Sequence, residues 1–374
     1  MLGLSCVSSP LWPLTDVILS KLDPEPGPRY LVAFQMFFVS SRNSIQRRFL
    51  CLLISVNASS DRVTIESGSI KNAQLVQRVL TKYSVSIVFL CLTGTDELSI
   101  TLNFLDAMQR AGHIKQLIYL SACGDFVSAK GVEDLMRVHG AAHVLVKSIV
   151  EQKLIYGAFP WKTTRLGPLL FVSNDLRSKN SMLTDGLFDE PLGEKGVGRV
   201  FESDIALAAC NAILEPGRWV GKKINISSLR RYKGSEVAKM WSRAIGRTVS
   251  MCENDDDSLL TLEDRVEAHV NQRDPSGWGR DLRLMYETFK KVAFGVTQDE
   301  YKLQIGYSGR NQKTTQSGWK RLVRHGFRTR LRSYPISQPD QHSHSATTRL
   351  NDCSWLSIDD SGTRIPQRRP SRTA

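Results

Sequence analysis

Residues 84–126 read SVSIVFLCLTGTDELSITLNFLDAMQRAGHIKQLIYLSACGDF, and their pattern decides the fold. Two apolar runs without alternation, Ile87 to Leu92 and Leu117 to Leu120, enclose a stretch with helical spacing. The helical stripe consists of Leu98, Leu102, Leu105 and Met108, and it ends before Gly112. Because strands buried on both faces do not alternate, this block predicts a βαβ unit of a parallel sheet covered by helices.

Small and polar residues follow both predicted strands. They are Thr93, Gly94 and Thr95 after the first strand, and Ser121, Ala122, Cys123 and Gly124 after the second. Ligands of such sheets bind beyond the carboxyl ends of the strands, and small side chains let them approach the backbone. We therefore expect a ligand at this edge. Cys123 fits either a reactive thiol or inert packing, and inert packing is the commoner role of a buried cysteine.

The length and the charge of the chain limit the classes of protein to which it can belong. A chain of 374 residues with 41% hydrophobic and 23% charged residues is of ordinary globular composition. Its net charge of +13 is concentrated in residues 310–374, which hold thirteen Lys or Arg and four Asp. Such a tail either binds nucleic acid through phosphate contacts or is solvated and disordered. The interleaved acids and few aromatic residues favour disorder, so we expect no nucleic-acid partner.

The cysteines and the hydropathy pattern exclude further classes. Seven scattered cysteines without a CxxC pair predict no disulfide framework, no metal site and a reducing compartment, hence a cytoplasmic protein. Pro10 and Pro13 interrupt the N-terminal apolar residues, which argues against a secretory signal. No uncharged run approaches the roughly 18 residues of a membrane helix.

Outside the central block, local patterns predict more elements. Strands are expected at residues 30–39, 49–56, 62–66, 163–166 and 223–227, and helices at 144–155, 205–214, 235–245, 281–292 and 299–305. Residues 173–186, SNDLRSKNSMLTDG, are expected to form a mobile loop over a site.

His143, Lys147 and Glu151 are spaced four residues apart, so a helix places them on one face. Spacing alone favours a solvated face with a contact between Lys147 and Glu151. The alternative is catalytic: an ammonium near a ribose donates hydrogen bonds to its hydroxyls and stabilises charge developing on a nearby carbonyl oxygen.

Several short motifs, taken in order, resemble the NmrA-like family of atypical short-chain dehydrogenases/reductases. The resemblance covers about residues 61–323. It rests on the βαβ block, Lys147 with Glu151, Thr164-Arg165-Leu166-Gly167-Pro168 followed by Asn174, Asp204-Ile205-Ala206, and Ala244-Ile245-Gly246-Arg247. Each motif is weak alone, and their order makes the combination specific.

The resemblance implies a Rossmann-type fold with a smaller α+β substrate subdomain and a preference for NADP, with NAD as the other option. It places the cofactor-binding residues at Thr93, Gly94, Thr95, Ser121, Ala122 and Lys147. It also places Lys147 near the ribose or the substrate carbonyl, and Asn174 in the substrate site. The superfamily's Tyr-x-x-x-Lys pair is here His143-x-x-x-Lys147, so His143 is a substitute acid or there is none.

The front of the chain departs from this family. A Rossmann fold opens with a strand and a glycine loop that closes on the cofactor's pyrophosphate. Between Met1 and Ser67 the only glycines are Gly3 and Gly27. We expect unrelated sequence to replace the first strand, the loop and the first helix, with residues 49–56 matching the family's second strand.

These expectations combine into a domain plan and two functions. The plan is an irregular segment (1–48), a Rossmann-like NAD(P)-binding domain (49–215), a smaller substrate or lid subdomain (216–325) and a disordered basic tail (326–374). The first function is NADP-dependent reduction of a small carbonyl, enone or aromatic metabolite, as in secondary metabolite biosynthesis. The second is a non-catalytic redox-sensing regulator or scaffold, cytoplasmic or nuclear, that binds a transcription factor through residues 174–186.

Overall fold

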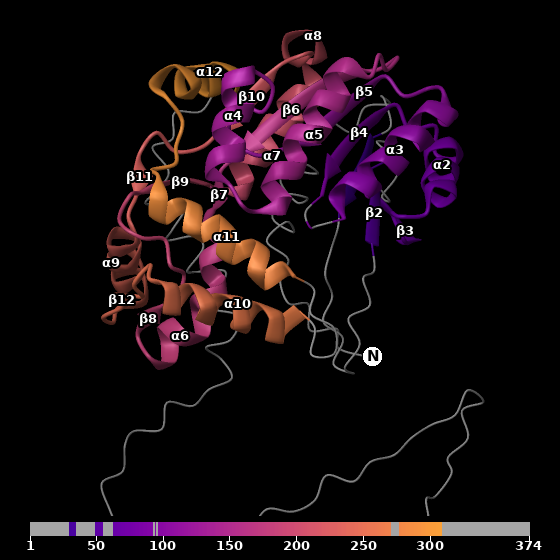
Figure 1. Ribbon diagram of the computed structural model, residues 1–374. Coiled ribbons are helices and arrows are strands. Elements are labelled where there is room, and N and C mark those ends of the chain that lie inside the picture. Colours follow the sequence, from indigo (N-terminus) through magenta and orange to yellow (C-terminus); the bar gives the residue numbers. More distant parts are fainter. Residues whose placement is uncertain are drawn as a thin grey trace, which may run out of the picture. The chain divides into compact units, whose positions relative to one another are not determined.

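The computed structural model describes residues 30–34, 49–54, 63–92, 94, 96–270 and 277–308 (Figure 1). The predicted disordered tail, residues 326–374, lies outside them. The described residues form a mixed α/β structure in which a large sheet has helices on both faces and a smaller part has its own core. The fold class predicted from the sequence is therefore confirmed.

The main sheet has seven strands in the order β10-β6-β5-β4-β1-β2-β3. The strands are β1 (Tyr30–Phe34), β2 (Phe49–Ile54), β3 (Val63–Gly68), β4 (Ile87–Cys91), β5 (Gln116–Leu120), β6 (Lys162–Pro168) and β10 (Lys223–Ile226). All pairs from β1 through β4, β5 and β6 to β10 are parallel. The βαβ unit predicted from residues 84–126 is present as β4, α3 (Glu97–Ala111) and β5.

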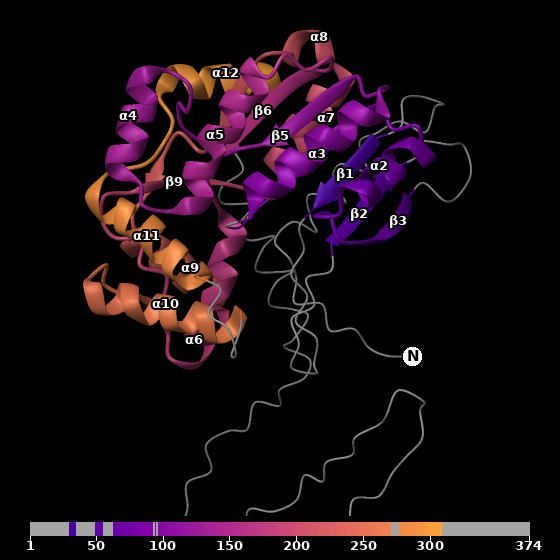
Figure 2. The ribbon, with the colours of Figure 1, turned by 45° about the vertical axis from the view of Figure 1, so that its right-hand side comes forward.

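Successive residues of β4 enter two different cores. Phe89 and Cys91 pack with helix α7 (Glu202–Leu214) on one face, whereas Val88 and Leu90 pack with the helices of the other face. Those helices are α2 (Ala73–Lys82), α3 and α5 (Ala142–Tyr156), and Figure 2 shows α2 and α3 side by side. This double burial explains the lack of alternation in the sequence.

The front edge of the sheet is not parallel. Strand β2 pairs antiparallel with both β1 and β3. Only residues 55–62 connect β2 to β3, and a parallel crossover needs a dozen or more residues, so the chain turns back directly. Residues 30–34, placed in the irregular segment by the domain plan, are a central strand of this sheet.

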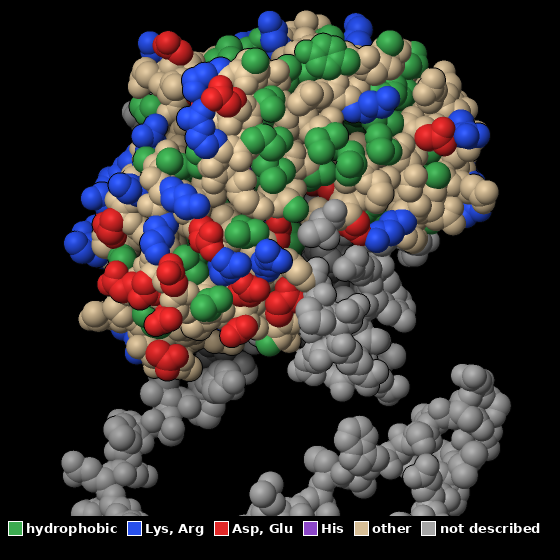
Figure 3. Space-filling view, viewed as in Figure 1, with side chains coloured by type: hydrophobic (Ala, Val, Ile, Leu, Met, Phe, Trp, Pro, Cys, Tyr) green, Lys and Arg blue, Asp and Glu red, His purple; other side chains and the backbone are tan. Residues whose placement is uncertain are grey.

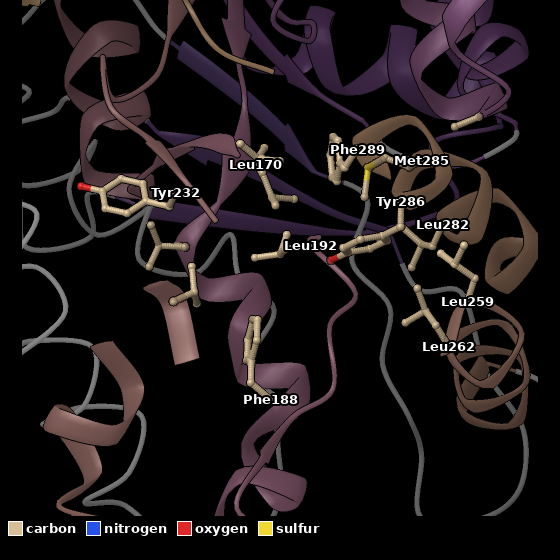
Figure 4. Close-up of a cluster of buried hydrophobic side chains, with 14 of the residues drawn as sticks. Leu170, Phe188, Leu192, Tyr232, Leu259, Leu262, Leu282, Met285, Tyr286 and Phe289 are labelled. Carbon is tan, nitrogen blue, oxygen red and sulfur yellow. The ribbon is translucent and has the colours of Figure 1, made fainter. Parts of the chain in front are cut away.

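The smaller part contains two short sheets and several helices. Its strands are β7 (Leu170–Phe171), β8 (Leu187–Phe188), β9 (Val197–Val200), β11 (Arg231–Tyr232) and β12 (Ser250–Met251). Its helices are η1 (Val172–Ser178), α6 (Lys179–Thr184), α9 (Gly234–Ile245), α10 (Asp256–Val270) and α11 (Trp278–Lys291). Figure 4 shows Phe188, Leu192 and Tyr286 converging in its apolar core. The remaining helices are α4 (Ala129–Val138), α8 (Pro216–Trp219) and α12 (Gln298–Ser308).

Three expectations need correction. Leu102 is 41% exposed, because α3 turns Ile100, Phe104 and Met108 toward the core instead of the whole leucine stripe. Residues 173–186 form η1 and α6 with buried polar anchors rather than an open loop. The predicted domain boundary at residue 215 is also wrong, because β10 pairs with β6 in the main sheet. A parallel pairing between strands so far apart in the chain could not be read from the local sequence.

Candidate functional site

Lys147 lies where the carboxyl ends of β4 and β5 meet. Its Nζ donates hydrogen bonds to the carbonyl oxygens of Leu92, at 3.1 Å, and Leu120, at 3.0 Å. The third donor reaches Oε1 of Glu97 at 2.6 Å. Helix α5 therefore delivers an ammonium group to the predicted ligand edge, and its three N–H groups all have protein partners.

Glu97 is the counterion of this ammonium. Its carboxylate is fully buried at the start of α3, and it also accepts a hydrogen bond from the Tyr119 hydroxyl at 2.6 Å. Burial raises the pKa of Glu97, and the Lys147 ammonium opposes this rise. The pKa of Tyr119 lies well above its usual value because of burial and the adjacent carboxylate. Lys147, Glu97 and Tyr119 form one interior polar cluster.

Ser121 and Glu151 form a second cluster beside the first. The Ser121 hydroxyl donates to Oε1 of Glu151, which also lies 2.6 Å from Nζ of Lys223 on β10. Arg165 on β6 approaches the other oxygen of Glu151 at 3.5 Å. Burial lowers the pKa of Lys223, while Glu151 opposes that shift. The contact between Lys147 and Glu151 suggested by their spacing is replaced by two separate ion pairs.

His143 lies on the first turn of α5, where it meets α11. Its Nδ1 contacts Oδ2 of Asp281, while Oδ1 of Asp281 accepts the backbone N–H of Ala142 at 2.5 Å. The ring centroid of Trp278 lies 5.3 Å from that of His143. The smaller part of the protein thus contacts this histidine through a carboxylate, Asp281, and an aromatic ring, Trp278.

The other predicted site residues have mixed positions. Gly94 has a φ of 120°, which fits the tight turn expected after β4, whereas Thr93 and Thr95 lie outside the described residues. Ala122 is partly buried after β5, and Asn174 is partly buried in η1. Burial raises the pKa of the Cys123 thiol to about 12, so the inert role fits better than the reactive one.

Sequence reasoning missed the acidic partners of the site. Glu97 and Asp281 lie 50 and 138 residues from the side chains they contact, and no motif records such pairs. It also missed Glu202, which accepts a hydrogen bond from Ser173. Burial raises the pKa of Glu202 to about 7. Its position in the first turn of α7 gave no distinct signal, because acidic residues are common at the start of helices.

No glycine loop accompanies the first strand. Strand β1 ends at Phe34, and residues 35–48, which follow it, contain no glycine. These residues lie outside the described part of the chain. Within that described part, no group of three or more His, Cys, Asp or Glu side chains could hold a metal ion. None of its helices is long and apolar enough to cross a membrane.

Solved structures with a similar fold include nucleotide-dependent enzymes. An NADPH-dependent quinone oxidoreductase of Escherichia coli, solved with NADPH, is 16% identical with a TM-score of 0.52, over 70% of this chain and 82% of that one. A nucleoside-diphosphate-sugar epimerase of Staphylococcus aureus is 14% identical with a TM-score of 0.52, over 67% and 81%. The triphenylmethane reductase of Citrobacter sp. is 16% identical with a TM-score of 0.50, over 69% and 82%. At these identities the likeness concerns the fold.

The family comparison is more specific than the structural one. A comparison with curated protein sequences finds no match. The NmrA-like family, in contrast, matches residues 55–292, which is more than half of the chain and includes the βαβ unit, Lys147 and the smaller part. The match begins at residue 55 and therefore leaves out strands β1 and β2. The chain belongs to the NmrA-like family.

Proposed function

We propose that this protein is an NADP-dependent oxidoreductase that reduces a small carbonyl, enone or aromatic metabolite. The observation that carries the proposal is Lys147, whose ammonium lies at the carboxyl ends of β4 and β5, where this fold binds ligands. Family membership supports it, as do proteins of similar fold that were solved with NADPH or NADP(H). NADP is the preferred cofactor and NAD the alternative.

The residues at this edge fit the nicotinamide and ribose part of such a cofactor. Lys147 supplies hydrogen-bond donors and positive charge, and Ser121 and Ala122 complete the edge after β5. In the sequence, Thr93, Gly94 and Thr95 follow β4, and we expect them to contact the same part of the cofactor. When bound, the cofactor supplies a hydride.

The chain's own groups have two roles in this proposal. The Lys147 ammonium stabilises negative charge on the substrate oxygen, and it must release one of its three protein partners to do so. His143 donates a proton to that oxygen from Nε2. Asn174, in η1, contacts the substrate.

The pyrophosphate part fits less well. Residues 28–67 contain no glycine, so backbone N–H groups cannot close on a pyrophosphate in the usual way. We therefore expect weak cofactor binding.

Turnover tests the proposal. NADPH oxidation, followed by its absorbance with a panel of quinones, enones and aldehydes, should be measurable and should fall about 100-fold in His143→Gln. The matched control is His113→Gln, which should leave turnover unchanged, since among the described residues His113 hydrogen-bonds only to backbone carbonyls near α2 and α3. A chain that shows neither NADPH binding nor oxidation at millimolar NADPH would contradict the proposal.

The second candidate is a non-catalytic redox-sensing regulator or scaffold that binds a transcription factor. Two observations favour it: the donors of Lys147 and Ser121 are already bonded within the protein, and one helical face exposes large apolar side chains. Leu102 of α3 and Ile149 and Tyr156 of α5 belong to this face, and Figure 3 shows apolar side chains gathered over these helices. NADPH binding without oxidation of any substrate supports this candidate over the first.

A further inference from the structure

Helix α11 lies along the turn between α4 and α5. Asp281 contacts His143 and Ala142, Leu284 packs 3.3 Å from the position of a Cβ on Gly140, and Thr288 reaches the Val138 carbonyl at 3.4 Å. The three α11 residues are spaced by three and four, so they share one face of the helix. This continuous contact fixes the position of Asp281 relative to α5.

The carboxylate of Asp281 has its two oxygens on two different groups of the same helical turn. Oδ1 accepts the Ala142 N–H, and Oδ2 faces Nδ1 of His143. The N-cap of α5 is Ala141, which has no side-chain oxygen, so Asp281 caps this helix from α11. Because the hydrogen bond from the Ala142 N–H fixes Oδ1, the carboxylate of Asp281 cannot turn freely, and Oδ2 stays directed at His143.

A carboxylate can only accept hydrogen bonds, so the ring nitrogen that faces it must carry the proton. Nδ1 of His143 is then an N–H donor, and among the described residues no hydrogen bond engages Nε2. Trp278 packs against the ring at 60° and restricts its rotation. Both contacts orient the same edge of the imidazole away from α11.

We propose that Asp281 is a positioning residue that holds His143 as the Nδ1–H form and presents Nε2 as the proton-transfer atom. The inference rests on the proposed function. In the reduction, the Nε2–H bond of the imidazolium breaks as the proton passes to the substrate oxygen, whose negative charge it neutralises. The neutral ring keeps its Nδ1–H bond to Asp281, and solvent returns the proton to Nε2.

The competing account is that Asp281 only caps α5. Asp281→Asn separates the two accounts, because an amide oxygen still caps Ala142 whereas the amide nitrogen cannot accept from Nδ1–H. The substitution should therefore turn the neutral ring to the Nε2–H form, with Nδ1 accepting from the amide. The matched control is Glu267→Gln, which alters a cap on Gly279 at the start of the same helix without contacting His143.

The first measurement is nitrogen-15 NMR of histidine-labelled full-length protein without cofactor, at a pH where the ring is neutral. The His143 signals are assigned by their loss in His143→Gln. The wild type and Glu267→Gln should show Nδ1 protonated, and Asp281→Asn should show Nε2 protonated. A wild-type ring protonated on Nε2, or a form unchanged by Asp281→Asn, overturns the proposal.

The second measurement is a double-mutant cycle on turnover. Asp281→Asn should lower kcat about 100-fold in the wild type and less than twofold in the His143→Gln background, because it acts through that ring. An equal loss in both backgrounds identifies a purely structural cap and overturns the proposal. A chain without any turnover contradicts the proposed function instead, and the NMR result then decides the proposal alone.

Discussion

The main sheet has a back half, strands β4, β5, β6 and β10, and a front half, strands β1, β2 and β3, and the two halves differ in strand direction and in their candidate ligand-binding residues. At the back, β4, β5, β6 and β10 run parallel; Lys147 binds the carbonyl groups at the ends of β4 and β5, and Glu151 forms ion pairs with side chains of β6 and β10. At the front, β1, β2 and β3 form antiparallel pairs, and no glycine follows β1 before Gly68. The comparison teaches that the parallel part of the sheet is built around buried ion pairs, whereas the part next to it lacks the glycines with which a Rossmann fold binds a pyrophosphate.

The largest expected effect concerns the buried ion pair of the back half. Lys147→Met leaves the Glu97 carboxylate buried without its counterion, which should lower the free energy of unfolding by about 3–5 kcal/mol in urea titrations. The control, Lys130→Met, breaks an exposed pair with Asp134 and should cost about 0.5 kcal/mol or less. An equal loss of unfolding free energy in the two variants would show that the buried ion pair of Lys147 contributes no more to stability than an exposed one.

The next effect is a pH dependence located at Glu202. Its pKa of about 7 in the folded state exceeds the ordinary value of 4.5, so the folded protein retains a proton that the unfolded chain loses. The free energy of unfolding should therefore fall by about 3 kcal/mol between pH 4.5 and 7, relative to Glu202→Gln. Urea titrations across this range measure the difference, with Glu133→Gln, at an exposed carboxylate, as the control. A difference that stays constant with pH would contradict the assignment.

A smaller effect tests close packing at the end of β6. A Cβ on Gly167 would lie 2.5 Å from Oδ1 of Asn225 and 2.8 Å from the backbone oxygen of Ala122, so Gly167→Ala should cost about 1–3 kcal/mol. Gly217→Ala, in α8, meets no atom within 4 Å and should change stability by no more than about 0.5 kcal/mol. Thermal unfolding compares them, and equal midpoints would show that this edge is loosely packed.

The sequence predicted those parts of the structure that depend on neighbouring residues. The strands β4 and β5 follow from unbroken apolar runs, and Gly112 and Gly246 end α3 and α9 with positive φ values, as expected. Pairing over long distances left no such signal. The pairing of β10 with β6 and the contact between Lys147 and Glu97 both depend on residues far apart in the chain.

The candidate site shows the same division. Lys147 and His143 could be identified from the sequence as candidate site residues because their spacing places them on one helical face. The structure confirms that both lie on α5. Their acidic partners, Glu97 and Asp281, could not be identified in this way, because they lie on other helices, α3 and α11. Spacing indicates which side chains share a face, whereas burial by other elements determines their charges and partners.

The most direct test of the comparison is the NADPH affinity of two chains, measured by energy transfer from tryptophan. One is this protein, and the other has residues 35–48 replaced by a segment with a G-x-x-G-x-x-G loop and a helix. Two restored hydrogen bonds to phosphate, at about 1.5 kcal/mol each, should tighten binding about 100-fold. Equal affinities, or no binding by either chain, would contradict the claim that the back half of a dinucleotide site is retained and only the phosphate half is missing.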